Sequence, residues 1–167
     1  MGIVDDYISE TNKYKQSHGD KTVVLLQCGS FFEIYGLKDK HGNITGSDLV
    51  KIAEICELNI AYKKICVQGK NVVMAGFGLQ MIDKYLRKLN EKGYTCPVIV
   101  QDVQAQNSPR SLKGIYSPGT NFMNETNNLT NNIMCLWINI NNSDIFLNNS
   151  LKQTIVCGSA CVDIYTG

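Results

Sequence analysis

Residues 21–36 read KTVVLLQCGSFFEIYG, and the predicted fold is built around this stretch. Its first part, residues 21–27, is a continuous apolar run rich in β-branched side chains, which is typical of a buried strand. The segment Cys28-Gly29-Ser30 interrupts the run, and residues 31–35 resume as a second strand. The stretch therefore predicts two strands separated by a glycine break.

Three other segments carry apolar residues at helical spacing. They cover residues 4–11, 49–56 and 82–89, and the last is followed by Gly93 as a candidate C-cap. Shorter apolar runs favour strands, and they lie at residues 71–76, 97–103 and 112–116. Helices that alternate with strands place residues 1–120 in the α/β class.

The composition changes near residue 120. Of seventeen asparagines in the chain, eleven fall between Asn121 and Asn149. Residues 121–132 lack periodicity, and we interpret them as a polar linker. Beyond it, residues 133–140, 144–147 and 154–167 predict consecutive antiparallel strands. Because the last pattern stops unfinished, we expect these strands to belong to the next domain of a longer protein.

Composition limits the classes of function. Of 167 residues, 44% are hydrophobic and 19% charged, which indicates a globular protein, and no stretch approaches the roughly 20 apolar residues of a membrane span. Net charge is +1, from 15 basic against 12 acidic residues in 1–120 and 1 against 3 in 121–167. We therefore expect no polyanion binding by bulk charge, and any nucleic-acid contact in residues 1–120.

The seven cysteines point to no disulfide framework and no metal. No CxxC occurs and neither histidine lies near a cysteine pair, so a zinc site is not expected. We interpret the cysteines as small apolar fillers in a reducing compartment. The N-terminus has no secretory h-region, so we expect an intracellular protein, in the cytoplasm, a nucleus, an organelle or a viral replication site.

No catalytic constellation is recognisable. The sequence contains no GxxxxGK[ST] phosphate-binding loop, and neither histidine has a local partner that would activate a thiol. The chain itself is therefore predicted not to be an enzyme, and no cofactor or metal is expected in it.

The unusual feature is the pair Phe31 and Glu33. Side chains alternate along a strand, so these two share one face while Phe32 and Ile34 occupy the other. An aromatic ring beside a carboxylate after a glycine break suits recognition better than core packing. Spacing alone leaves the alternative open that Phe31 packs at the rim of a sheet and Glu33 is solvated.

Five segments, in order, resemble the first domain of the MutS family of DNA mismatch repair proteins. They are YKQSHGDKTVVLLQCGSFFEIYG (14–36), DLVKIAEICELNIAYKK (48–64), NVVMAGFGLQMIDKYLRKLNEKGYTCPVIVQ (71–101), RSLKGIYSPGT (110–120) and ACVDIYTG (160–167). The first holds the family's Phe-x-Glu motif, and the last resembles the strand that opens the connector domain. Departures, such as Ser30 where the family commonly has Asp, indicate a divergent branch, viral or organellar.

The resemblance implies a fold and a function. The expected fold is a mixed β-sheet flanked by helices in residues 1–120, a linker at 121–132, and the first strands of a second α/β domain, the connector domain, at 133–167. Phe31 would act as a wedge that stacks on a mispaired or unpaired base, and Glu33 would hydrogen-bond to that base. The partner would be double-stranded DNA with a mismatch or a small loop.

The resemblance also implies contacts to the DNA backbone and properties of the complete protein. Lys63 and Lys64 lie where the family has a T-x-R segment, and Arg110 precedes the last strand of the domain. These three are candidate phosphate contacts, although solvated surface positions explain them equally well. By resemblance, the complete protein would be a homodimeric, DNA-dependent ATPase that uses ATP and Mg²⁺, with those features outside this chain.

Two alternatives stay open at this point. The chain could be a MutS-like module that binds branched or recombination DNA without reading mismatches. A reading from another class is a small enzyme that depends on one of the seven thiols.

Overall fold

The computed structural model describes residues 2–102, 109–120, 132–141, 146–147, 150–151 and 154–163. The chain separates into two compact units, Met1–Asn128 and Leu129–Gly167. Of the predicted linker, residues 121–131 lie outside the described residues. The predicted domain boundaries at residues 120 and 133 stay predictions.

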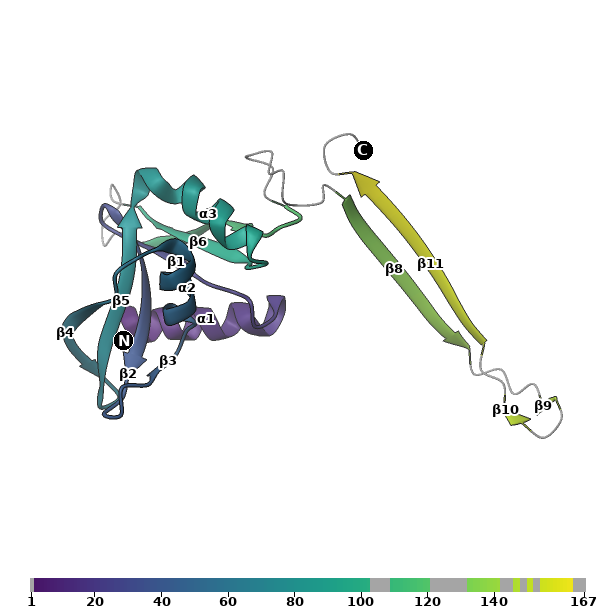
Figure 1. The fold of residues 1–167 in the computed structure, drawn as a ribbon, viewed down its shortest axis with the longest axis horizontal. Helices are drawn as coiled ribbons and strands as arrows, with labels where there is room; N and C mark the ends of the chain where they lie inside the picture. Colours follow the sequence, from purple (N-terminus) through teal and green to yellow (C-terminus); the bar gives the residue numbers. More distant parts are fainter. Residues whose placement is uncertain are drawn as a thin grey trace. The chain divides into compact units, whose positions relative to one another are not determined.

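A seven-stranded mixed sheet forms the first unit (Figure 1). Its strands are β1 Leu25–Cys28, β2 Phe31–Lys38, β3 Ile44–Thr45, β4 Ala61–Val67, β5 Lys70–Gly78, β6 Cys96–Gln101 and β7 Arg110–Tyr116. The order is β4-β5-β2-β1-β6-β7, with β3 paired to β2. Only β1 and β6 run parallel among these pairs. The α/β class and the mixed sheet predicted from sequence are confirmed.

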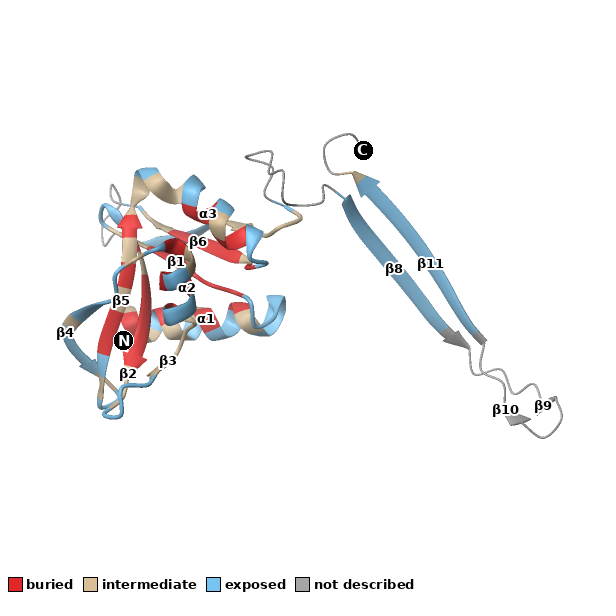
Figure 2. Ribbon diagram, in the orientation of Figure 1, coloured by how far each residue is buried: buried red, intermediate tan, exposed pale blue. Residues whose placement is uncertain are grey.

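Helices cover both faces of this sheet. They are α1 Ile3–His18, α2 Leu49–Cys56 and α3 Ile82–Glu91, the last preceded by a 3₁₀ turn η1 at Leu79–Met81. The ring of Tyr7 in α1 meets Tyr35 of β2 edge to face, with centroids 5.2 Å apart. On the opposite face Phe32 contacts Phe77, and Phe77 contacts Tyr85 of α3. Buried residues line the strands and the inner sides of the helices (Figure 2).

The central stretch forms a hairpin. β1 ends at Cys28, which pairs with Phe31, so the loop contains only Gly29 and Ser30. Gly29 has φ +59 and Ser30 has no positive φ, which is the pattern of a type II′ turn with glycine at its first position. The predicted first strand is shortened to Leu25–Cys28, since residue 22 makes only an isolated bridge to Thr95.

Strand β4 is not predicted from the sequence. Most of its residues are exposed, so its pattern has no apolar alternation to indicate a strand. Its ladder to β5 also shifts between Tyr62 and Cys66, which marks a bulge. The segment is a strand because its backbone pairs with β5, and burial of its own side chains contributes little.

The second unit contains a long antiparallel pair, β8 Asn132–Asn141 with β11 Thr154–Asp163, and a short pair, β9 Phe146–Leu147 with β10 Ser150–Leu151. The expected antiparallel strands after the linker are confirmed for β8 and β11. In the segment predicted at residues 144–147, the structure contains the short strand β9, which pairs with β10 and not with β8. No helix among the described residues is long and apolar enough to cross a membrane.

The cysteines are all free thiols, but the expectation that they fill the core holds for only two of them, Cys56 and Cys96, which are buried. Cys28 is intermediate, and the other four are exposed: Cys66 on β4, Cys135, Cys157 and Cys161. Burial raises the pKa of the Cys56 thiol to about 11, and burial also raises the pKa of Cys96. No group of three or more His, Cys, Asp or Glu residues in the described parts could hold a metal ion.

Adjacent positions on α2 provide a test of the core. Leu49 is fully buried and packs against β2, where its Cδ2 atom lies 3.2 Å from the position of a Cβ added to Gly36. Leu49→Ala is expected to lower the free energy of unfolding by about 2–5 kcal/mol. Val50→Ala, at a side chain 50% exposed, is the matched control and should change it by less than about 0.5 kcal/mol. Urea denaturation followed by circular dichroism measures both; equal effects would contradict the assigned burial.

Thiol alkylation tests the two cysteine environments. The thiolate is the reactive form, so a raised pKa slows alkylation at neutral pH and the rate should rise as pH approaches 11. In the folded protein at pH 7.5, about one hour of iodoacetamide treatment should label Cys66 and leave Cys56 and Cys96 unmodified. Peptide mass spectrometry reads each site. Labelling of Cys56 as fast as Cys66 would show that the core opens.

Candidate nucleic-acid interface

The sheet topology gathers several predicted site residues at one end. Phe31 begins β2 and pairs with Cys28 at the end of β1 and with Gly78 at the end of β5. Because β6 runs parallel to β1, its last residue, Gln101, reaches the same end and pairs with Arg110. The Gln101 side chain accepts a hydrogen bond from the Gly29 backbone N–H at 3.1 Å, which ties the hairpin turn to β6.

Phe31 is the exposed aromatic of this end. Its side chain is 54% exposed, whereas Phe32 and Ile34, on the other face of β2, are buried. The alternation predicted from sequence is confirmed. Phe31 stands opposite Gly78, which has no side chain to cover it. Beside the ring lies a shallow hollow of about 300 Å³ lined by Phe31, Glu33, Asn59, Ala61, Met74, Ala75 and Gly76.

Glu33 lies on the same face as Phe31 but is not a solvated strand residue. Its side chain is only 13% exposed, and its Oε2 atom accepts a hydrogen bond from Lys63 Nζ at 2.7 Å. The hydroxyl of Tyr35 donates to the same carboxylate oxygen. The alternative in which Glu33 is freely solvated is therefore wrong: the carboxylate is held by two donors from the protein.

Tyr35 connects this carboxylate to the core. Its ring packs on Tyr7, and its hydroxyl lies 3.0 Å from Lys63 Nζ and 3.4 Å from Cys28 Sγ. The Lys63 ammonium also sits 4.7 Å from the Tyr35 ring centroid, within range of a cation–π contact. Burial, then hydrogen bonds to Cys28 and Glu33, raises the pKa of Tyr35. The hydroxyl therefore keeps its proton and stays a donor for Glu33.

The strand between β4 and β2 carries a glycine next to Glu33. Lys63 belongs to β4, and β5 lies between β4 and β2. Opposite Glu33 on β5 stands Gly76. A Cβ at this position would lie 2.7 Å from the Phe32 carbonyl oxygen and 3.5 Å from Glu33 Cγ. Any larger residue would therefore clash with this carbonyl oxygen and disturb the pairing of β5 with β2.

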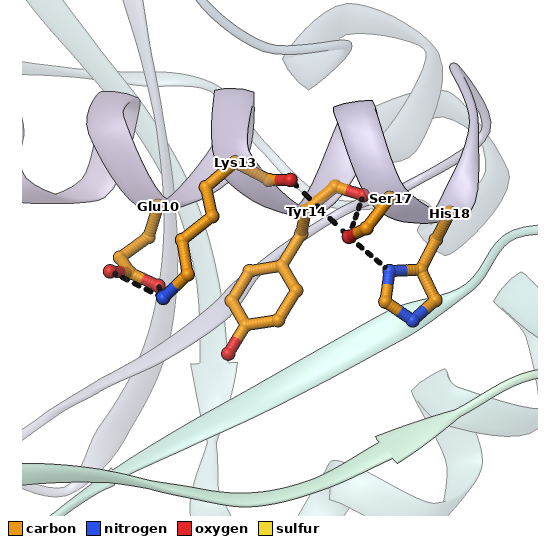
Figure 3. A network of polar contacts seen from close by, with 5 residues as sticks. All are labelled: Glu10, Lys13, Tyr14, Ser17 and His18. Atoms are coloured by element: carbon orange, nitrogen blue, oxygen red, sulfur yellow. Dashed lines mark hydrogen bonds and ion pairs between the residues drawn. The ribbon is translucent and has the colours of Figure 1, made fainter.

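The other two predicted cations are not in this cluster. Lys64 is exposed on β4, and no ion pair involves it among the described residues. Arg110, also exposed, lines a separate groove of about 460 Å³ between α1 and β7, together with acidic residues of α1. One of these, Glu10, is paired with Lys13 at 3.2 Å (Figure 3). The structure thus brings Phe31, Glu33 and Lys63 together and leaves Lys64 outside this cluster. It places Arg110 at the same end of the sheet as Phe31, but three strands from β2.

Sequence reasoning missed Tyr35 and Gly76 as members of this site. A signal was present for Tyr35, because it continues the same two-residue alternation as Phe31 and Glu33. Gly76 carried no comparable signal, since its role follows from the pairing of β5 with β2.

Comparisons with known proteins agree with this picture. The sequence model of the family described as MutS domain I matches residues 9–125, which is more than half of the chain. The described elements α1 to β7 lie almost wholly within that match.

Individual relatives carry related names. A protein of Acanthamoeba polyphaga mimivirus, named as a DNA mismatch repair protein MutS homologue, is 29% identical over 163 residues, covering 96% of this chain and 14% of the relative. The DNA mismatch repair protein MutS of Bacteroides fragilis is 27% identical, covering 92% and 15%. MutS 1 of Halobacterium salinarum is 26% identical, covering 72% and 12%.

The chain thus spans about one seventh of the length of the first two relatives. The viral relative agrees with the divergent branch that the sequence indicated. Because the family model covers more than half of the chain, the expected resemblance is confirmed: the chain belongs to the MutS family and contains its domain I.

Proposed function

We propose that this chain senses mismatches in DNA mismatch repair, by binding double-stranded DNA that carries a mispaired base or a small loop. The observation that carries the proposal is Phe31, an aromatic side chain 54% exposed at the end of a sheet, on the same face as a held carboxylate. Membership of the MutS family and the names of the relatives support it.

The wedge mechanism follows from the energetics of unstacking. Inserting an aromatic ring between base pairs costs a few kcal/mol per step and kinks the duplex, which returns contacts elsewhere. At a mismatch the pairing is already poor, so the cost is lower. Phe31 thereby selects mismatches by the deformability of the site. Glu33 then accepts a hydrogen bond from the base next to the ring.

Other parts of the complete protein supply most of the affinity. A chain with net charge +1 offers little attraction to a polyanion. In the complete protein, by family membership, we propose a homodimer with ATP and Mg²⁺ bound outside this chain. Lys64 and Arg110 stay candidate phosphate contacts, since both are exposed.

A thiol-dependent enzyme that uses Cys28, Cys56 or Cys96 is not favoured. Burial is the largest cause that raises the pKa of Cys28, the thiol nearest to Phe31 in the pairing register. Burial likewise raises the pKa of Cys56 and Cys96. A catalytic thiol needs the opposite shift.

Removal of the Phe31 ring tests the wedge. In the complete protein, Phe31→Ala should abolish the preference for a G·T or one-base-bulge duplex and leave matched-duplex binding nearly unchanged. Loss of base stacking costs about 1–3 kcal/mol, or roughly 5- to 150-fold in mismatch affinity. Fluorescence anisotropy with both duplexes measures the ratio.

The matched control is Tyr62→Ala. Tyr62 is also an exposed aromatic, but its register with Val73 assigns it to the other face of the sheet. It should leave the ratio unchanged. If Phe31→Ala weakens both duplexes equally, Phe31 serves the fold or general DNA binding, and a branched-DNA module becomes the better reading.

Substitution of Glu33 should give a different signature. Glu33→Gln keeps the shape, removes the negative charge and leaves the Lys63 ammonium without its charged partner. We expect matched-duplex binding to strengthen and the mismatch preference to fall, by about tenfold for a lost charged hydrogen bond. The same anisotropy titrations measure both effects. An unchanged preference would mean that Glu33 does not contact the base.

A further inference from the structure

We infer that Lys63 is a positioning residue for Glu33, and that it acts on DNA through this carboxylate rather than by contacting phosphate. This inference rests on the proposed function. Lys63 then contributes to mismatch selectivity. The sequence had instead indicated a phosphate contact, which would contribute to affinity for any duplex.

The contacts of the Lys63 ammonium support the assignment. It donates to Glu33 at 2.7 Å and to the Tyr35 hydroxyl at 3.0 Å, and it lies over the Tyr35 ring. Three contacts with two residues, Glu33 and Tyr35, fix the position of the ammonium within the protein. Its side chain is 34% exposed, and the Glu33 side chain is 13% exposed. A pair this well shielded is stronger than an exposed surface pair.

Electrostatics explain why such a pair is useful beside DNA. A lone carboxylate on a DNA-binding face is repelled by every nearby phosphate. An ammonium at 2.7 Å cancels this repulsion at short range. The carboxylate can then approach the duplex with its second oxygen, Oε1, to which no hydrogen bond is assigned among the described contacts.

The pair also restricts the geometry of Glu33. Lys63 and Tyr35 both donate to Oε2, so the carboxylate is held from two directions. Tyr35 is anchored in turn by Tyr7 of α1. A side chain held in advance loses less conformational entropy when it meets a base, which favours selective contact.

Lys64 provides a matched control one residue away. It has the same charge and belongs to the same strand, but it is exposed and carries no ion pair among the described residues. Two lysines of one strand thus separate two roles. Lys63 adjusts selectivity, and Lys64 is the better candidate for a phosphate contact.

A double-mutant cycle in the complete protein tests the inference. The four proteins are wild type, Glu33→Gln, Lys63→Met and the double variant, each titrated with matched and G·T duplexes by anisotropy. Lys63→Met should reduce the mismatch-to-matched affinity ratio by about tenfold, as expected for loss of a hydrogen bond to a charged group. In the Glu33→Gln background the same change should have little further effect on this ratio. Lys64→Met should leave the ratio unchanged in both backgrounds.

Salt dependence separates the two roles of a lysine without relying on mismatch reading. The logarithm of the binding constant for matched DNA falls linearly with the logarithm of the salt concentration. The slope of this line is about 0.9 for each phosphate that a cation neutralises. If Lys63 pairs with Glu33, removing both charges together should leave the wild-type slope unchanged. If Lys63 contacts phosphate, the double variant should lose about 0.9 from the slope, which overturns the inference.

The remaining outcomes are also decisive. Additive effects of Glu33→Gln and Lys63→Met on the ratio would overturn the inference while leaving mismatch reading intact. Equal binding of both duplexes by the wild type would refute the proposed function, and the salt slope would still decide the role of Lys63. The same cycle is measured with Lys63→Gln in place of Lys63→Met. This second variant gives the result if Lys63→Met fails to fold.

Discussion

The antiparallel pairing of β2 with β5 is the constraint on which the rest of the first unit depends. It runs from Phe31 opposite Gly78 to Lys38 opposite Asn71 without a shift of register. Side chains that alternate along β2 therefore face either α3 and its apolar neighbours or α1 and the Glu33 cluster. A slip by one residue would move Phe31 into the core and expose Phe32. The same register determines the core and the exposed site.

The polar cluster is anchored to the core through Tyr35. Tyr35 contributes a buried ring to the packing against Tyr7 and a hydroxyl to the Glu33 carboxylate. Lys63 enters from an exposed strand and satisfies the same oxygen. Each charged group of the cluster thus has a partner, as partly buried charges require. Residues that stabilise the fold and residues that carry the candidate function are in direct contact here.

Local patterns account for what the sequence could predict. The helical stripes of α1, α2 and α3 and the alternation of β2 repeat within a few residues, and the structure contains them at the expected places. Strand β4 was missed, because an exposed strand with a bulge has no period to detect. The position of Phe31 was predictable for the same reason as the strand that carries it.

The contact between Glu33 and Lys63 lies beyond local patterns. The two residues are 30 positions apart and meet only because β4, β5 and β2 are neighbours in that order. Their opposite charges were visible in the sequence, but no spacing rule links them. The need for glycine at position 76 is also invisible in local patterns, because it arises from the close approach of β2 on the opposite side. A sequence can therefore indicate which residues are unusual more readily than which of them act as a unit.

The tight hairpin turn has a kinetic consequence. Phe31 follows Gly29 and Ser30 directly, and the turn is hydrogen-bonded to Gln101 of β6, so the backbone that carries the ring is already paired in the free protein. Among the described residues, Phe31 is joined to β1 by this short turn alone, and encounters with matched and mismatched sites should therefore begin at similar rates. Under the proposed function, the difference between them is a difference in residence time: the protein leaves a matched site quickly and stays longer where the ring has entered the stack.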